Sequence, residues 1–130
     1  MRDPGEYVQH YVPELSGPKA EDAWHSLVEA GPTALPYLVD AFGTATAPQV
    51  RVSLVRVIAE YRSAEGVPFL EALLRNDEPE IWKAALDGLV MCGGEAALAA
   101  LRAAKAIATS GKREWIDEAV GQITETHRSG

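Results

Sequence analysis

The sequence is short of cysteine, of aromatic residues and of long apolar runs. Cys92 is the only cysteine among 130 residues, so no disulfide can form within the chain. A lone thiol is typical of a protein in a reducing compartment. No stretch approaches the roughly 20 apolar residues that span a bilayer, and the first ten residues lack the apolar segment of a signal peptide. We therefore expect a soluble, cytoplasmic protein without membrane contact.

Positive charge is scarce as well. The chain has 19 acidic residues against 12 lysines and arginines, which gives a formal net charge of -7, and neither half of it is basic. Nucleic-acid affinity depends largely on neutralising phosphates, so we expect no nucleic-acid partner. A basic protein is a better candidate partner, because opposite fields speed encounter and help to select partners.

Catalytic and metal-binding motifs are lacking too. The histidines are scattered, and none stands at a known zinc spacing from another ligand. They are His10, His25 and His127. The pair Gly111-Lys112 lacks the earlier glycine and the following Ser or Thr of a phosphate loop, so it predicts a turn between helices. We expect no metal, no cofactor and no enzymatic activity, and we interpret Cys92 as a core thiol.

What the sequence does contain is a repeat. The segments 35–38 (LPYL), 67–70 (VPFL) and 98–101 (LAAL) recur at steps of 32 and 31 residues. The segments between them also align. Val50, Leu54, Val55 and Ile58 fall on Ile81, Ala85, Leu86 and Leu89, and a step of 34 carries these to Trp115, Ala119, Val120 and Ile123. This apolar spacing is typical of a helical core stripe, so each period predicts two helices that must share a core with their neighbours.

The pattern predicts seven main helices after a short helix or turn near 4–12, and no strands. The helices are expected at about 19–30, 33–42, 48–62, 65–75, 79–92, 94–108 and 112–126. Three caps are also expected. Gly43 would end a helix in the left-handed conformation, Ser63 would be an N-cap, and Asp77 with Glu80 would form a capping box.

The boxes ALPYL (34–38) and GVPFL (66–70), each followed by an apolar helix such as QVRVSLVRVIAEY (49–61), resemble HEAT repeats of the short-period PBS-lyase type. The third box departs from the pattern, because Ala99 stands where the others have proline. The resemblance covers residues 20–126. It implies an all-α fold, a short right-handed α-solenoid of about 3.5 to 4 stacked helical hairpins.

The chain then divides into three segments. Residues 1–18 would form an N-terminal turn or capping helix, 19–126 the repeat domain and 127–130 a polar tail. The adjacent Trp115 and Ile116 of the last helix would either cap the stack or expose an apolar patch, so the chain is expected to be a monomer or a weak homodimer.

The resemblance implies that the second helix of each hairpin lines a concave face. Two rows of residues there escape the core stripe and mix aromatic, sulfur and charged side chains, as partner-binding patches often do. The rows are Trp24, Arg56 and Asp87, which continue to Gly121, and Val28, Glu60 and Met91, which continue to Glu125. The alternative is a solvated face, with an Arg56–Glu60 ion pair and Trp24 in the core.

The leading hypothesis is a non-catalytic protein-interaction module that binds another protein on its concave face. One alternative is an immunity or inhibitor protein that masks a cognate toxin or enzyme. Another, implied by the resemblance, is a bilin lyase-like or other accessory factor that acts on a partner protein. A third is a scaffold for a neighbouring domain. The repeat alone does not choose among them, because fold does not fix function.

Overall fold

The computed structural model describes the backbone of residues 3–129 and the side chains of residues 3–125. This part of the chain is all-α, as predicted. Its helices are α1 (Pro4–Tyr11), α2 (Ala20–Ala30), α3 (Leu35–Thr44), α4 (Pro48–Glu60), α5 (Val67–Leu73), α6 (Pro79–Cys92), α7 (Gly94–Ile107) and α8 (Ser110–Ser129). Short 3-10 segments lie at Val12–Ser16, Pro32–Ala34 and Ala64–Gly66.

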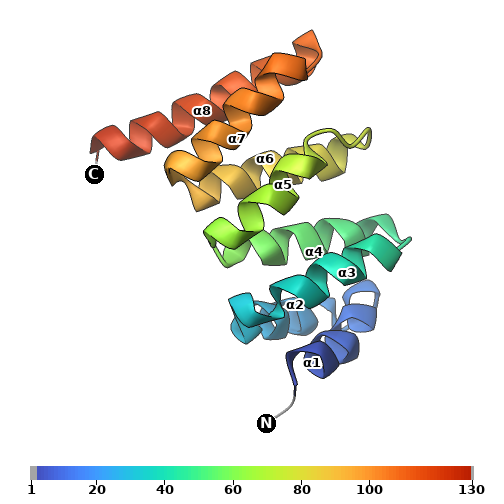
Figure 1. The fold of residues 1–130 in the computed structure, drawn as a ribbon. Coiled ribbons are helices and arrows are strands. Elements are labelled where there is room, and N and C mark those ends of the chain that lie inside the picture. The colour runs from blue at the N-terminus through green and yellow to red at the C-terminus, as the bar shows by residue number, and fades with distance from the viewer. Residues whose placement is uncertain (1–2, 130) are drawn as a thin grey trace.

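The helices stack in two layers (Figure 1). We call α1, α3, α5 and α7 the outer layer, and α2, α4, α6 and α8 the inner layer. Consecutive helices pair as hairpins, and each hairpin contacts the next mainly through its inner-layer helix. The described ends of the chain lie at opposite ends of the stack. This arrangement is the predicted solenoid of stacked helical hairpins.

The inner layer is the more closely packed of the two. A Cβ atom added at Gly88 of α6 would lie only 3.0 Å from the Cβ of Ala59 on α4, so glycine permits this close approach. By contrast, α3 and α5 in the outer layer make little or no contact. The predicted concave face belongs to the inner layer, because this layer contains the second helix of each hairpin.

The core runs between the layers along the whole stack. Its largest fully buried side chains are Leu27, Leu38, Leu54, Ile58, Leu70, Ile81, Leu89 and Leu101, together with Val55 and Val57. Burying one such side chain contributes about 1.5–3 kcal/mol. Helix α4 is apolar on most sides because it lies between α2 and α6. Among the described side chains, none of the buried ones is polar or charged.

One predicted cap is confirmed and one is wrong. The hydroxyl of Ser63 accepts a hydrogen bond from the backbone N–H of Glu65 at 3.2 Å, as expected of an N-cap. Gly43 does not end a helix, because α3 continues to Thr44. The left-handed glycines that follow helices are Gly31 after α2 and Gly93 after α6.

The predicted capping box is also wrong. Pro79 occupies the first helical position of α6, so Glu78 and not Asp77 is the N-cap. The side chain of Glu78 makes no capping bond. Instead, the Asn76 Oδ1 accepts a hydrogen bond from the backbone N–H of Glu78 at 2.8 Å.

One residue of the core stripe predicted for α8 is wrong. Trp115 is 47% exposed, whereas Ala119 and Ile123 of the same stripe are buried, as is the adjacent Ile116. The predicted phase of α8 is therefore right. Trp115 is left uncovered because α8 has an inner-layer neighbour on one side only, α6, whereas α4 and α6 each have two.

Candidate functional site

A groove of about 530 Å³ runs between α4 and α6 on the inner layer. Each helix contributes one ridge, at helical positions i, i+3, i+4 and i+7, and the two ridges are related by a step of 31 residues. The ends of each ridge are exposed, whereas Ala84 in the middle is buried. The lining residues are Gln49, Val52, Ser53 and Arg56 from α4, and Glu80, Lys83, Ala84 and Asp87 from α6. The repeat itself therefore builds this groove.

The groove brings together Arg56 and Asp87, two of the predicted partner-binding residues. The groove also contains Glu80 and Lys83, which do not belong to the predicted partner-binding rows. None of these four side chains forms an ion pair with another described residue, and the Arg56–Glu60 pair weighed above does not form. Arg56, Glu80 and Asp87 are thus available to a partner, whereas the ammonium of Lys83 lies over the rings of Trp82 and Trp115.

A smaller depression, of about 60 Å³, lies between α6 and α8. Its lining comprises Leu86, Asp87, Val90, Trp115, Glu118, Ala119 and Gln122. Asp87 lines both hollows, so they adjoin. We call the two together the inner groove.

Two neighbouring residues of α6 contact the exposed indole of Trp115. The rings of Trp82 and Trp115 meet edge to face, with centroids 5.8 Å apart. The Nζ of Lys83 lies 4.5 Å from the centre of the Trp115 ring, at cation–π distance. The repeat alignment placed this side chain in the core stripe, although the sequence also allowed Trp115 and Ile116 to form an exposed apolar patch; it was not among the predicted site residues.

The other four predicted site residues lie outside the inner groove. Trp24 is half-buried on α2 and contacts the core, and its ring meets that of His25 edge to face at 5.2 Å. Val28, Glu60 and Met91 are half-buried as well, and none of them lines the groove. A role for these residues in binding stays a prediction.

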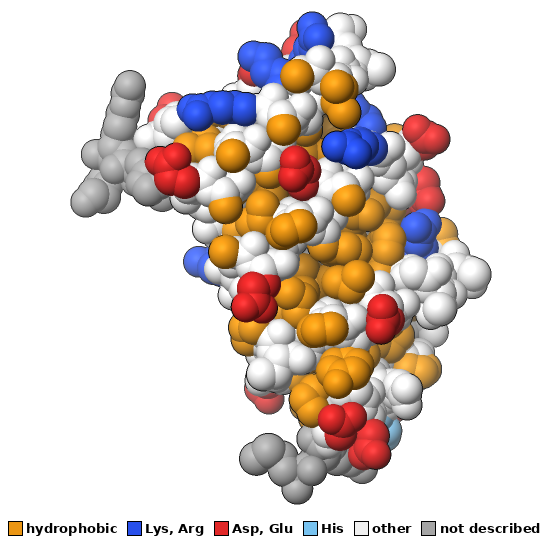
Figure 2. Space-filling view, in the orientation of Figure 1, with side chains coloured by type: hydrophobic (Ala, Val, Ile, Leu, Met, Phe, Trp, Pro, Cys, Tyr) orange, Lys and Arg blue, Asp and Glu red, His pale blue; other side chains and the backbone are white. Residues whose placement is uncertain are grey.

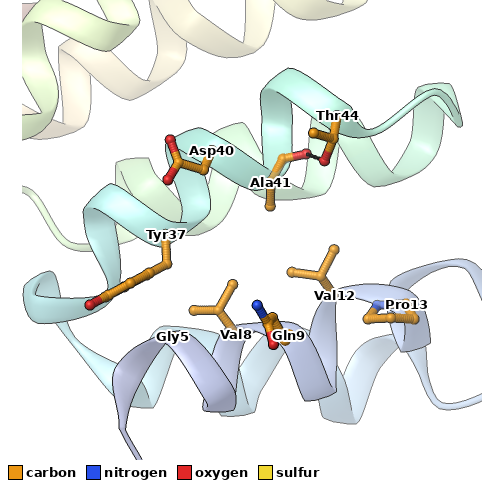
Figure 3. Close-up of a pocket in the computed structure, with 9 residues that line it drawn as sticks. All are labelled: Gly5, Val8, Gln9, Val12, Pro13, Tyr37, Asp40, Ala41 and Thr44. Carbon is orange, nitrogen blue, oxygen red and sulfur yellow. Dashed lines mark hydrogen bonds between the residues drawn. The ribbon is translucent and has the colours of Figure 1, made fainter.

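A third cavity, of about 320 Å³, lies between α1 and α3 of the outer layer. Figure 3 shows Val8 of α1 and Val12 of the following 3-10 segment pointing toward α3, with Asp40 pointing away from α1. The Tyr37 ring covers Gly5 so closely that a Cβ atom there would lie 2.9 Å from the ring. The mostly apolar lining and the close Gly5–Tyr37 contact indicate an incompletely filled helix–helix contact.

The outer layer faces the viewer in Figure 2, where apolar side chains run along its centre and Lys and Arg gather toward the α7–α8 end. The exposed apolar residues of α7 are mostly alanines, such as Ala96, Ala99 and Ala103. The large exposed apolar side chains of this layer are Tyr37 and Ile107. Alanine offers little contact area, whereas binding hot spots are enriched in tryptophan, tyrosine and arginine.

Two groups with perturbed pKa values serve the fold. Burial raises the pKa of the Tyr61 hydroxyl above its ordinary value, and this hydroxyl donates a hydrogen bond to the carbonyl oxygen of Leu27 at 2.6 Å. Burial also raises the pKa of the half-buried Cys92 thiol, whose sulfur lies 3.9 Å from the carbonyl oxygen of Ser63. A raised pKa keeps the thiol protonated and unreactive.

Lys112 is likewise a structural residue. Its Nζ donates hydrogen bonds to the carbonyl oxygens of Leu74 at 2.9 Å and Asn76 at 3.0 Å, just after α5. These bonds tie the start of α8 to the loop between α5 and α6. The predicted turn at Gly111-Lys112 is wrong, because both residues lie in the first turn of α8.

No three His, Cys, Asp or Glu side chains in the described part of the chain come together as a metal site would require. No helix within it has the length and apolar character needed to cross a membrane.

Comparison with known proteins identifies the repeat. No curated protein matches the chain. The family profile of HEAT repeats matches residues 35–121, about two-thirds of the sequence. The matched span begins at α3 and ends within α8, so it covers most of the last three hairpins of the stack. The chain belongs to the HEAT-repeat family.

Proposed function

We propose that this protein is a non-catalytic interaction module that holds another protein in its inner groove. HEAT repeats are generally protein-interaction modules. The observation that carries the proposal is the groove itself, where charged side chains without ion-pair partners stand beside a half-exposed tryptophan. A rigid aromatic anchor beside charged groups is the usual composition of a binding hot spot.

The inner groove is favoured over the outer layer for two reasons. Its two ridges come from helices packed closely along each other, so a partner meets a preformed surface and pays little ordering entropy. Trp115 also offers a large anchor there, whereas the exposed face of α7 offers mainly alanine.

Charge favours a basic partner. The net charge of -7 attracts a basic protein over a distance of about one Debye length, roughly 8–10 Å at moderate salt. The mixed charges in the groove would then select among the proteins that arrive. An inhibitor or immunity protein that masks a basic enzyme or toxin would be a specialised form of this role.

The test compares charge reversals on the two layers. A partner is first captured from source cells with the wild-type protein, identified and purified. Its dissociation constant is then measured by calorimetry for Arg56→Glu and Asp87→Arg in the inner groove. The matched controls are Arg102→Glu on α7 and Asp40→Arg on α3, both exposed and in the outer layer.

Each groove reversal should weaken binding by about tenfold or more, equivalent to roughly 1.4 kcal/mol. The outer-layer reversals should leave it unchanged. Circular dichroism must show the same helicity for all four variants, because every substituted side chain is exposed. Equal binding by the groove variants and the wild type would refute the proposal, as would equal losses in both layers.

A further inference from the structure

We infer that the depression between α6 and α8 receives an arginine side chain of the partner protein. This inference rests on the proposed function, because it assumes that the partner docks on the inner layer. Beyond that function, it names the type of partner side chain that enters the depression.

The depression combines three kinds of surface. Its apolar part is formed by Leu86, Val90 and Ala119, and Trp115 supplies an aromatic ring. Two carboxylates complete it, Asp87 from α6 and Glu118 from α8. An arginine has matching parts: an aliphatic stem for the apolar lining and a planar guanidinium for the ring and the carboxylates.

The two carboxylates are unused within the described part of the chain. Neither Asp87 nor Glu118 has an ion-pair or hydrogen-bond partner there. The nearby Asp117 differs, because its Oδ1 pairs with the Nζ of Lys105 at 2.6 Å. Two unpaired carboxylates on facing helices therefore leave the hollow with negative charge that a cation would neutralise.

The Trp115 ring already attracts a cation. Lys83 lies 4.5 Å from its centre, yet Lys83 is not among the residues that line the depression. The ring is therefore placed for cation–π contact and adjoins a hollow that Lys83 leaves open. Around the depression, the single positive charge of Lys83 is opposed by the two negative charges of Asp87 and Glu118.

Other side chains fit less well. An acidic side chain would be repelled by Asp87 and Glu118. An apolar side chain would cover these carboxylates without offering a hydrogen bond, which carries a desolvation cost. Lysine would pair with them only as a point charge, whereas a guanidinium can stack on the indole and donate several hydrogen bonds in its plane.

The experiment uses Nα-acetyl-arginine amide as a probe. Nα-acetyl-citrulline amide is the matched control, because citrulline has nearly the same shape and no charge. Each is titrated into the full chain while the indole N–H resonances of Trp115 and Trp24 are followed by NMR. We expect a saturable shift at Trp115, with a dissociation constant on the order of millimolar, and no comparable shift at Trp24.

A pair of double variants gives the second readout. Replacing both carboxylates of the depression, in Asp87→Asn with Glu118→Gln, should weaken arginine amide binding about fivefold or more, as expected from losing two exposed charge contacts. The control, Asp40→Asn with Glu95→Gln, removes two exposed carboxylates from the outer layer and should bind like the wild type.

Three results would overturn the inference: no saturable shift at Trp115, an equal affinity for the citrulline amide, or equal losses in the two double variants. These failures are distinguishable from failure of the proposed function. If a purified partner still depends on Arg56 and Asp87 while the arginine amide does not bind, the inner groove stands as the docking site and only the assignment of arginine falls.

Discussion

The indole rings of Trp82 and Trp115 meet edge to face, with centroids 5.8 Å apart and planes inclined at 83°. The two residues play different parts, because Trp82 is 8% exposed and Trp115 is 47% exposed. The buried Trp82 packs against the exposed ring, so the last hairpin presents a large aromatic side chain on the inner layer that is supported by the core. Such a ring loses little entropy when a partner covers it.

The register of α8 predicts a clear difference between two neighbouring substitutions. Ile116→Ala should lower the free energy of unfolding by about 2–5 kcal/mol, because it leaves a cavity in the core. Trp115→Ala should lower it by about 1 kcal/mol, the order of the aromatic pair that it removes. Urea unfolding followed by circular dichroism measures both. If Trp115→Ala lowered the free energy of unfolding more than Ile116→Ala, Trp115 would be the core residue, as the repeat alignment predicts.

Tyr61 links two hairpins through its hydroxyl. Tyr61→Phe should cost about 1 kcal/mol, because it removes the hydrogen bond to the carbonyl oxygen of Leu27 and leaves that acceptor unpaired. The substitution also has a consequence for pH. Burial raises the pKa of Tyr61, so the folded state holds its proton where the unfolded chain, with an ordinary pKa of 10.0, releases it.

The sign of the pH effect follows from that difference. Above about pH 10 the folded state binds more protons than the unfolded state, so stability falls as the pH rises. The contribution of Tyr61 is fully present below this pH. The free energy of unfolding, measured by urea titration, should therefore decrease less from pH 8 to pH 11 for Tyr61→Phe than for the wild type. An equal decrease in both proteins would mean that this hydroxyl titrates normally in the folded protein.

The close approach of α4 and α6 depends on Gly88. Gly88→Val should destabilise the protein by about 1–3 kcal/mol or more, because its side chain would press on Ala59 and Leu70. Gly121→Ala on α8 is the control. Nothing lies within 4 Å of a Cβ atom there, so the helix propensity of alanine should stabilise the protein by about 0.5–1 kcal/mol. Thermal unfolding measures both changes, and a neutral Gly88→Val would contradict the packing.

Arg62 adopts the left-handed conformation, with φ of 48°, just after α4. Glycine tolerates this conformation without a steric penalty, so Arg62→Gly should stabilise the protein by about 0.5–1 kcal/mol. The matched control removes the same charge inside a helix. Arg102→Gly on α7 should destabilise by about 1 kcal/mol. Denaturation midpoints should shift in opposite directions; shifts of the same sign would show that backbone strain at Arg62 is unimportant.

The fold was predictable because local signals agreed along most of the chain. Pro36, Pro48, Pro68 and Pro79 stand in the first turns of four helices, and the apolar stripe of α4 recurs in α6 at a constant step. The HEAT-repeat resemblance pointed to the second helix of each hairpin, and the step of 31 residues then aligned Arg56 with Asp87, which both line the inner groove.

The rest of the site depended on neighbouring helices, which the repeat alignment does not specify. The repeat aligns Trp115 with Val50 and Ile81, and Ala119 and Ile123 of the same stripe are buried as expected. Trp115 is exposed because α8 has an inner-layer neighbour on one side only, whereas α4 and α6 have one on each side. Lys83 was missed for a similar reason, since its importance comes from Trp115.

The most direct test of the central claim is a carbene footprint of the protein, free and bound to its purified partner. The three large apolar side chains exposed within the described residues divide cleanly between the layers, with Trp115 beside the inner groove and Tyr37 and Ile107 on the outer layer. Docking in the inner groove predicts that the partner protects Trp115 while Tyr37 and Ile107 remain labelled. Protection of Tyr37 or Ile107, with Trp115 still labelled, would contradict the account.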